Sequence, residues 1–162
     1  MKKFTFGFTL IEVMVTVAIA AIVIVVAVPS LNSLYEGVRS KNNTDKIHSI
    51  LVLARNQAIN YGTIVNICSL QTATSCKSGT DWSKGIRVFV EGNGVTTELK
   101  VIDSFDDNDK VKGPSKAISF SSDGISTGGD FIYCPNGKAD ESKSISVSSS
   151  GRVSYGDEGK SC

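Results

Sequence analysis

The sequence is poor in histidine, and this restricts the chemistry that it can support. His48 is the only histidine among 162 residues, and no two cysteines stand at CxxC spacing, so the usual ligand sets of a zinc site are missing. The HExxH motif of metalloproteases and the GxxxxGK[ST] motif of nucleotide-binding loops are also absent. We therefore expect a protein that is not an enzyme and has no metal or cofactor.

Net charge is also low. The chain has 17 basic and 16 acidic residues, and without Lys2 and Lys3 only 15 basic residues remain. A nearly neutral chain has no general electrostatic attraction for nucleic acid. The one local excess is acidic, and we interpret it as a solvated loop: Asp103, Asp106, Asp107 and Asp109.

Four cysteines lie in the second part of the chain, at Cys68, Cys76, Cys134 and Cys162. An even number of cysteines in a small exported domain predicts two disulfides, although the sequence alone permits three pairings. Proximity favours Cys68–Cys76, which closes a short Ser/Thr-rich loop, together with Cys134–Cys162.

A long apolar run occupies residues 8–28, and only Thr9, Glu12 and Thr16 interrupt it. As a helix, these 21 residues span roughly 31 Å, which is about one bilayer core. In a secretory signal the cleavage site follows the apolar run, whereas here the small residue Gly7 precedes it. Lys2 and Lys3 predict a cytoplasmic N-terminus and a head on the other side of the membrane.

Glu12 needs an explanation, because a carboxylate in a membrane helix costs roughly 2.5–3.5 kcal/mol on insertion scales. If the chain is cut before Phe8, the new α-amine lies one helical turn away, and the same amine of a neighbouring subunit could neutralise Glu12. The alternative is that Glu12 lies near the interface and extends into water.

The run Gly7-Phe8-Thr9-Leu10-Ile11-Glu12, with Pro29 further on, resembles the leader of type IV prepilins and pseudopilins. The resemblance implies that a prepilin peptidase cuts after Gly7 and methylates Phe8, that Glu12 supports assembly, and that Pro29 bends the helix. It also implies three segments: a cleaved leader at 1–7, a transmembrane and assembly helix at 8–29, and a periplasmic head at 30–162.

Beyond Pro29, apolar residues recur at three- or four-residue steps up to Tyr61, which predicts an amphipathic helix that Gly62 stops. After Gly62 the period shortens toward two, and short strands are expected at 63–69, 85–91, 98–105, 117–121, 130–134, 144–148 and 152–155. Trp82 is expected to anchor the core or its rim. The predicted fold is α+β: a helical spine that packs on a small antiparallel β-meander with disulfides.

Several segments of the predicted head resemble the GspH/FimT subgroup of minor pilins and pseudopilins, in its FimU-like form. They are residues 53–59 followed by 65–68, residues 82–89, and the late segments 118–124 and 145–153 with Gly151-Arg152. This resemblance implies a minor type IV pilin of the tip or initiation complex that primes pilus assembly. The alternative is the H-type minor pseudopilin of a type II secretion system.

A second alternative is DNA capture in natural transformation, since some FimT-like pilins bind DNA through a GRxR-like segment. Here that segment reads Gly151-Arg152-Val153-Ser154 and lacks the second arginine. The basic residues that could contribute are Arg152, Lys138, Lys143 and Lys160.

The family resemblance also implies partners and a location. The partners are the prepilin peptidase, other minor and major pilins or pseudopilins, the inner-membrane assembly platform, and membrane lipid before assembly. The location is the bacterial inner membrane, with a single pass and a periplasmic head, and then the pilus or pseudopilus.

Overall fold

The computed structural model describes residues 9–162 apart from positions 73 and 93, and at positions 29 and 30 it describes the backbone alone. The chain divides into two parts, one up to Glu36 and the other from Gly37 to Cys162, and each is described by itself. One helix, α1 (Leu10–Tyr61), contributes to both parts, and every strand belongs to the second.

The first part consists of the apolar beginning of α1. Thr9 caps this end of the helix, because its hydroxyl accepts a hydrogen bond from the backbone N–H of Glu12 at 3.3 Å. The Thr16 hydroxyl donates to the carbonyl of Val13 at 2.9 Å, so its polar group is satisfied within the helix. The helical backbone runs through Pro29 without a break.

The other end of α1 stops at Tyr61, as the sequence predicts. Gly62 has a φ of 61°, and its N–H donates to the carbonyl of Ile59, while the N–H of Thr63 reaches back to Ala58 at 3.2 Å. This pair of bonds is a Schellman motif, which needs a left-handed residue at the position of Gly62. The chain then turns directly into the first strand.

The second part, which we call the head, contains two antiparallel sheets. Sheet A has the order β2-β1-β3-β4, with β6 also paired to β1, and sheet B has the order β5-β7-β8-β9. The strands of sheet A are β1 (Val65–Thr72), β2 (Ser75–Lys77), β3 (Ile86–Gly92), β4 (Val95–Ile102) and β6 (Ile118–Phe120). Those of sheet B are β5 (Lys110–Lys112), β7 (Gly129–Cys134), β8 (Lys143–Val147) and β9 (Val153–Tyr155), with a 3-10 turn, η1 (Pro135–Gly137), after β7.

The predicted α+β fold, a helix packed on antiparallel strands with two disulfides, is confirmed, but the strands do not form a single meander. Two strands of three residues each, β2 and β5, were not predicted. The third predicted strand lies earlier than expected, since β4 starts at Val95 and ends at Ile102. Strands that follow one another in the chain pair at two tight turns: Gly92 of β3 pairs with Val95 of β4, and β8 pairs with β9.

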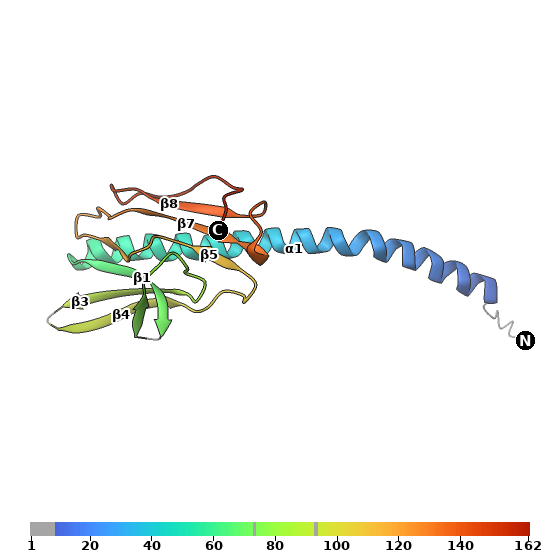
Figure 1. Cartoon of the computed structure of the whole chain (residues 1–162), viewed down its shortest axis with the longest axis horizontal. Helices are drawn as coiled ribbons and strands as arrows, with labels where there is room; N and C mark the ends of the chain where they lie inside the picture. Colours follow the sequence, from blue (N-terminus) through green and yellow to red (C-terminus); the bar gives the residue numbers. More distant parts are fainter. Residues whose placement is uncertain (1–8, 73, 93) are drawn as a thin grey trace, which may run out of the picture. The chain divides into compact units, whose positions relative to one another are not determined.

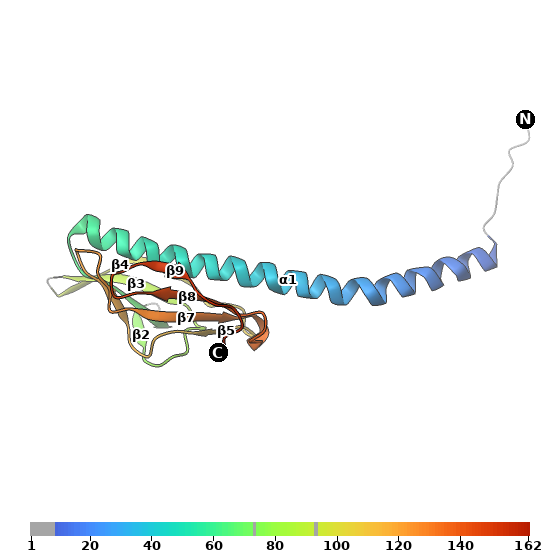
Figure 2. The same ribbon diagram turned by 90° about the horizontal axis from the view of Figure 1, so that it is seen from above.

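The core of the head lies between α1 and the two sheets. Within the head, sheet A and sheet B lie along opposite flanks of the helix (Figure 1), and both sheets lie on one side of it (Figure 2). The helix contributes one buried face to the core: Ile47, Ile50, Leu51, Ala54 and Ala58. Trp82 is buried, as predicted; its Nε1 donates to the carbonyl of Pro114 at 2.9 Å, and its ring meets Phe131 edge-on.

Candidate assembly surfaces

The apolar beginning of α1 is exposed over nearly its whole length. Leu10 is 79% exposed and Val25 is 74% exposed, and Ala27 is the one residue between Leu10 and Val28 that is even half-buried. In the described part of the chain, α1 is the one helix long and apolar enough to cross a membrane. A surface of this size is unstable in water, so it requires either lipid or the apolar surfaces of other helices.

Glu12 lies in the first turn of this helix, with its side chain exposed. Among the described residues no cation lies within ion-pair distance of its carboxylate. A negative charge is favourable at a helix N-terminus, but it remains costly in lipid without a counter-charge. The predicted counter-charge, the α-amine of a processed Phe8, and the cleavage site at Gly7 lie outside the described residues. The bend predicted at Pro29 stays a prediction.

The head contains two disulfides, Cys68–Cys76 and Cys134–Cys162. Cys68–Cys76 joins β1 to β2 across their hairpin, and Cys134–Cys162 joins the end of β7 to the last residue of the chain. These are the two pairs that proximity in sequence favours. Disulfides form in oxidising compartments, which agrees with a head outside the cytoplasm.

One member of the acidic run is not solvated. The Asp109 side chain is fully buried, and it accepts hydrogen bonds from the Tyr133 hydroxyl and from the backbone N–H of Asn136, the latter at 2.9 Å. Arg39 from α1 lies 2.9 Å from the same carboxylate. Burial, followed by the hydrogen bond to Asp109, raises the pKa of Tyr133 above its usual value. The solvated-loop interpretation is therefore wrong for Asp109, which ties the helix to sheet B.

Carboxylates lie beside some of the four basic residues considered for DNA binding. Lys143 forms an ion pair with Glu158, and Lys160 lies 3.8 Å from Asp157. Arg152 is exposed just after the turn that joins β8 to β9, and Lys138 is exposed just after η1. The charges of Lys143 and Lys160 are thus balanced by neighbouring carboxylates, which weakens any pull on a phosphate backbone.

Residues Gly124–Gly128 spell the GxSxG pattern of serine hydrolases, but their geometry is not that of a nucleophile. Ser126 is 7% exposed and lies in the turn between β6 and β7, where its hydroxyl accepts a hydrogen bond from the N–H of Gly128 at 3.1 Å. A hydrolase needs its serine on a strand-to-helix elbow beside a histidine. His48, the only histidine, instead stacks on Tyr155 with ring centroids 4.6 Å apart.

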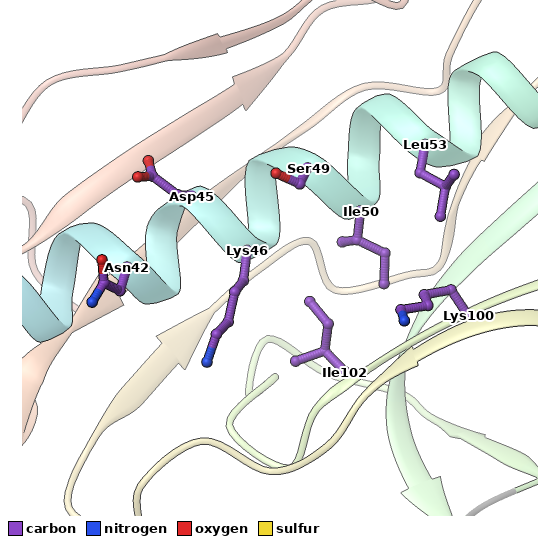
Figure 3. A pocket seen from close by; sticks show the side chains of 8 residues that line it. All are labelled: Asn42, Asp45, Lys46, Ser49, Ile50, Leu53, Lys100 and Ile102. Carbon is purple, nitrogen blue, oxygen red and sulfur yellow. The ribbon is translucent and has the colours of Figure 1, made fainter.

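A groove of about 710 Å³ lies between α1 and β4 (Figure 3). Ile50 and Leu53 of the helix point toward Ile102 of β4 and form its apolar floor. Lys46 and Lys100 extend into the same space, whereas Asp45 points to the opposite side of the helix. We call this feature the α1–β4 groove. The sequence does not predict this groove, since the strand that borders it was expected later in the chain, at 98–105.

Family models match two segments of the chain. The model described as type II transport protein GspH matches residues 43–151, and the model described as a prokaryotic N-terminal methylation motif matches residues 3–28. The first match covers more than half of the sequence and most of the head. No curated protein sequence matches the chain.

Solved structures share the fold. Two crystal structures of the type IV minor pilin FimU from Pseudomonas aeruginosa match with TM-scores of 0.60 and 0.62 at 24% sequence identity. They cover 75% and 76% of this chain, and 96% and 92% of their own chains. The minor pseudopilin EpsH from the type 2 secretion system of Vibrio cholerae matches with a TM-score of 0.56 at 10% identity, over 72% of this chain and 95% of its own.

Proposed function

Because the chain belongs to the GspH family, and is thus a minor pilin or pseudopilin, we propose that it acts in the tip or initiation complex that primes a type IV pilus. The observation that supports this role is the exposed, largely apolar surface of α1 up to Val28, with Glu12 as its one charge. The family and its structural neighbours are structural pilins rather than enzymes, which fits a protein whose work is assembly.

The proposed mechanism uses one surface in two environments. Before assembly, residues 10–28 lie in the inner membrane, and in the fibre the same residues pack against the helices of other subunits. Prepilin peptidase removes residues 1–7 and frees the α-amine of Phe8. That amine, on the same or a neighbouring subunit, pairs with Glu12 and sets the axial position of the incoming helix.

A second candidate is the minor pseudopilin of a type II secretion system, and the description of the matching family model favours it. Both candidates use the same helix and the same head. Deleting the chain separates them: loss of surface fibres in electron micrographs supports the pilus, and loss of secreted proteins from the medium supports secretion. DNA capture is not proposed, since Lys143 and Lys160 already lie against carboxylates.

The assembly role of Glu12 is tested by Glu12→Ala in the full chain. Its loss removes the counter-charge for the α-amine, and we expect the variant to stay in the membrane while its incorporation into fibres falls about tenfold or more. The measurement compares the amount of this subunit in sheared fibres with the amount in membranes, by immunoblot.

Thr16→Ala is the matched control, because it removes a polar group from the same apolar stretch. The Thr16 hydroxyl bonds only to its own helix, so we expect this variant to be incorporated normally. If Glu12→Ala is incorporated as well as Thr16→Ala, the pairing role of Glu12 is wrong.

A further inference from the structure

The two flanks of the helix in the head are not closed in the same way. On one flank β9 contacts the helix directly, since the Tyr155 ring stacks on His48 and its hydroxyl donates to Asp45 Oδ1 at 2.8 Å. On the other flank no hydrogen bond or ring contact of this kind joins α1 to β4 among the described residues, and the α1–β4 groove stays open (Figure 3). A smaller hollow of about 360 Å³ lies beside β9, whereas the α1–β4 groove measures about 710 Å³. The helix is therefore tied to β9 along one flank and left more open beside β4 along the other.

β4 presents a free backbone edge beside this groove. It is the last strand in the order β2-β1-β3-β4, so within the described chain its outer N–H and C=O groups face no other strand. Its eight residues, Val95–Ile102, exceed the usual length of a strand, which leaves room for a partner to pair along it. Free edges of this kind accept an additional strand through main-chain hydrogen bonds.

The side chains around the groove define what can fill it. Ile50, Leu53 and Ile102 offer an apolar floor, and alternate side chains of a strand added to β4 would point toward that floor. Lys46 contacts only the Asn43 side chain, at 3.3 Å, and Lys100 has no anionic partner in the described part of the chain. The groove is thus apolar at its centre and positively charged at its side.

We propose that the α1–β4 groove is the docking site for an extended segment of a neighbouring pilin-type subunit, which adds to sheet A as a strand beside β4. Its apolar side chains enter the groove, and its acidic side chains meet Lys46 and Lys100. This inference rests on the proposed assembly function and names the face through which the head meets its partner.

A second copy of this chain that pairs through its own β4 does not fit. Two β4 strands paired antiparallel are related by a two-fold axis perpendicular to the sheet. Rotation about this axis makes every element that lies parallel to the sheet run in the opposite direction in the second copy. The helix packs flat on the sheet (Figure 2), so its direction would be reversed too. Two chains whose apolar N-terminal segments enter one membrane cannot be arranged in this way. This excludes pairing through two β4 edges, and we take the partner to be a different subunit of the same class.

The docking site is tested by photocrosslinking in living cells. The full chain carries p-benzoylphenylalanine in place of Leu53, in the groove, or in place of Ile125, an apolar residue that is 55% exposed in the β6–β7 turn. We expect irradiation to give one main adduct from position 53, which mass spectrometry identifies as another subunit with a prepilin leader, crosslinked in an extended segment rich in apolar and acidic residues. Position 125 should not give this adduct.

The charge requirement is tested by adding Lys46→Glu and Lys100→Glu to the position 53 protein. We expect the adduct to fall about five- to tenfold, because two attractive contacts become repulsive. The control pair, Lys41→Glu with Lys116→Glu, makes the same change of charge at exposed positions that do not line the groove, and should change the adduct by less than about twofold.

Three results would overturn the inference: no adduct from position 53 at normal protein level, an adduct only with a second copy of the chain, or equal losses in the two lysine pairs. Failure of the proposed function is visible separately. If deletion of the chain leaves fibres and secretion unchanged, the assembly role is wrong. If deletion abolishes either one while the Lys46→Glu, Lys100→Glu protein assembles and crosslinks normally, only the docking site is wrong.

Discussion

At the scale of single residues, the buried Asp109 carboxylate is the most consequential polar group in the head. It joins Arg39 of α1 to Tyr133 of β7 and to the backbone of η1, so one side chain connects the helix to sheet B. Asn43 adds to this cluster, because its amide donates to the Tyr133 hydroxyl at 2.7 Å. A buried charge is stable when all its partners are in place. If the Asp109 charge is removed, the Arg39 guanidinium loses this buried counter-charge.

We therefore expect Asp109→Asn to lower the free energy of unfolding by about 2–4 kcal/mol. Asp107→Asn is the control, since it removes the same charge from an exposed side chain two residues earlier and should change stability by less than about 0.5 kcal/mol. Urea unfolding of the full chain in detergent, followed by the fluorescence of Trp82, measures both. Equal stabilities of the two variants would contradict the role given to Asp109.

At the scale of elements, the β6–β7 turn and the β8–β9 turn approach each other closely, and each has a glycine at the point of approach. An added Cβ at Gly151, in the β8–β9 turn, would lie 1.7 Å from the backbone oxygen of Gly124, in the β6–β7 turn. Both glycines have positive φ and lie beside the Arg55 side chain. The close approach of these two backbones is possible only without side chains at this point.

Gly151→Ala should therefore destabilise the head by about 3 kcal/mol or more, from backbone strain and overlap together. Gly159→Ala is a control for the strain alone, because Gly159 has the same φ of +76° and nothing within 4 Å of an added Cβ. We expect it to cost about 1 kcal/mol. Thermal unfolding of both variants compares the two effects. If Gly159→Ala loses as much stability as Gly151→Ala, overlap with the Gly124 backbone is not what makes Gly151 necessary.

The sequence predicts these elements unequally well. The end of α1 is predicted correctly because Gly62 is a local stop signal, and burial of Trp82 follows from its size. The division into two sheets and the burial of Asp109 are not predicted, because each depends on partners far along the chain: Arg39 lies 70 positions before Asp109. The groove is also missed, since it exists only where β4 and α1 come together.

At the scale of the whole molecule, the proposed leader processing is testable on the mature protein. If prepilin peptidase acts after Gly7, mass spectrometry of the subunit from fibres should find an N-terminus at Phe8 that carries one methyl group. The physical reason to expect processing is that, in the proposed mechanism, a free α-amine pairs with Glu12. An intact Met1 in assembled fibres would contradict it, and a Gly7→Val variant that keeps its leader and stays in the membrane would support it.

The exposed apolar face of residues 10–28 bears on whether subunits can be recycled. Lipid chains and packed apolar helices are similar surroundings for this face, so exchanging one for the other changes the free energy little. In the proposed filament, such contacts alone therefore favour neither assembly nor disassembly strongly, and extension would need energy from outside the helix. For the same reason, a subunit that leaves the proposed filament would find the bilayer an equally suitable environment for this face.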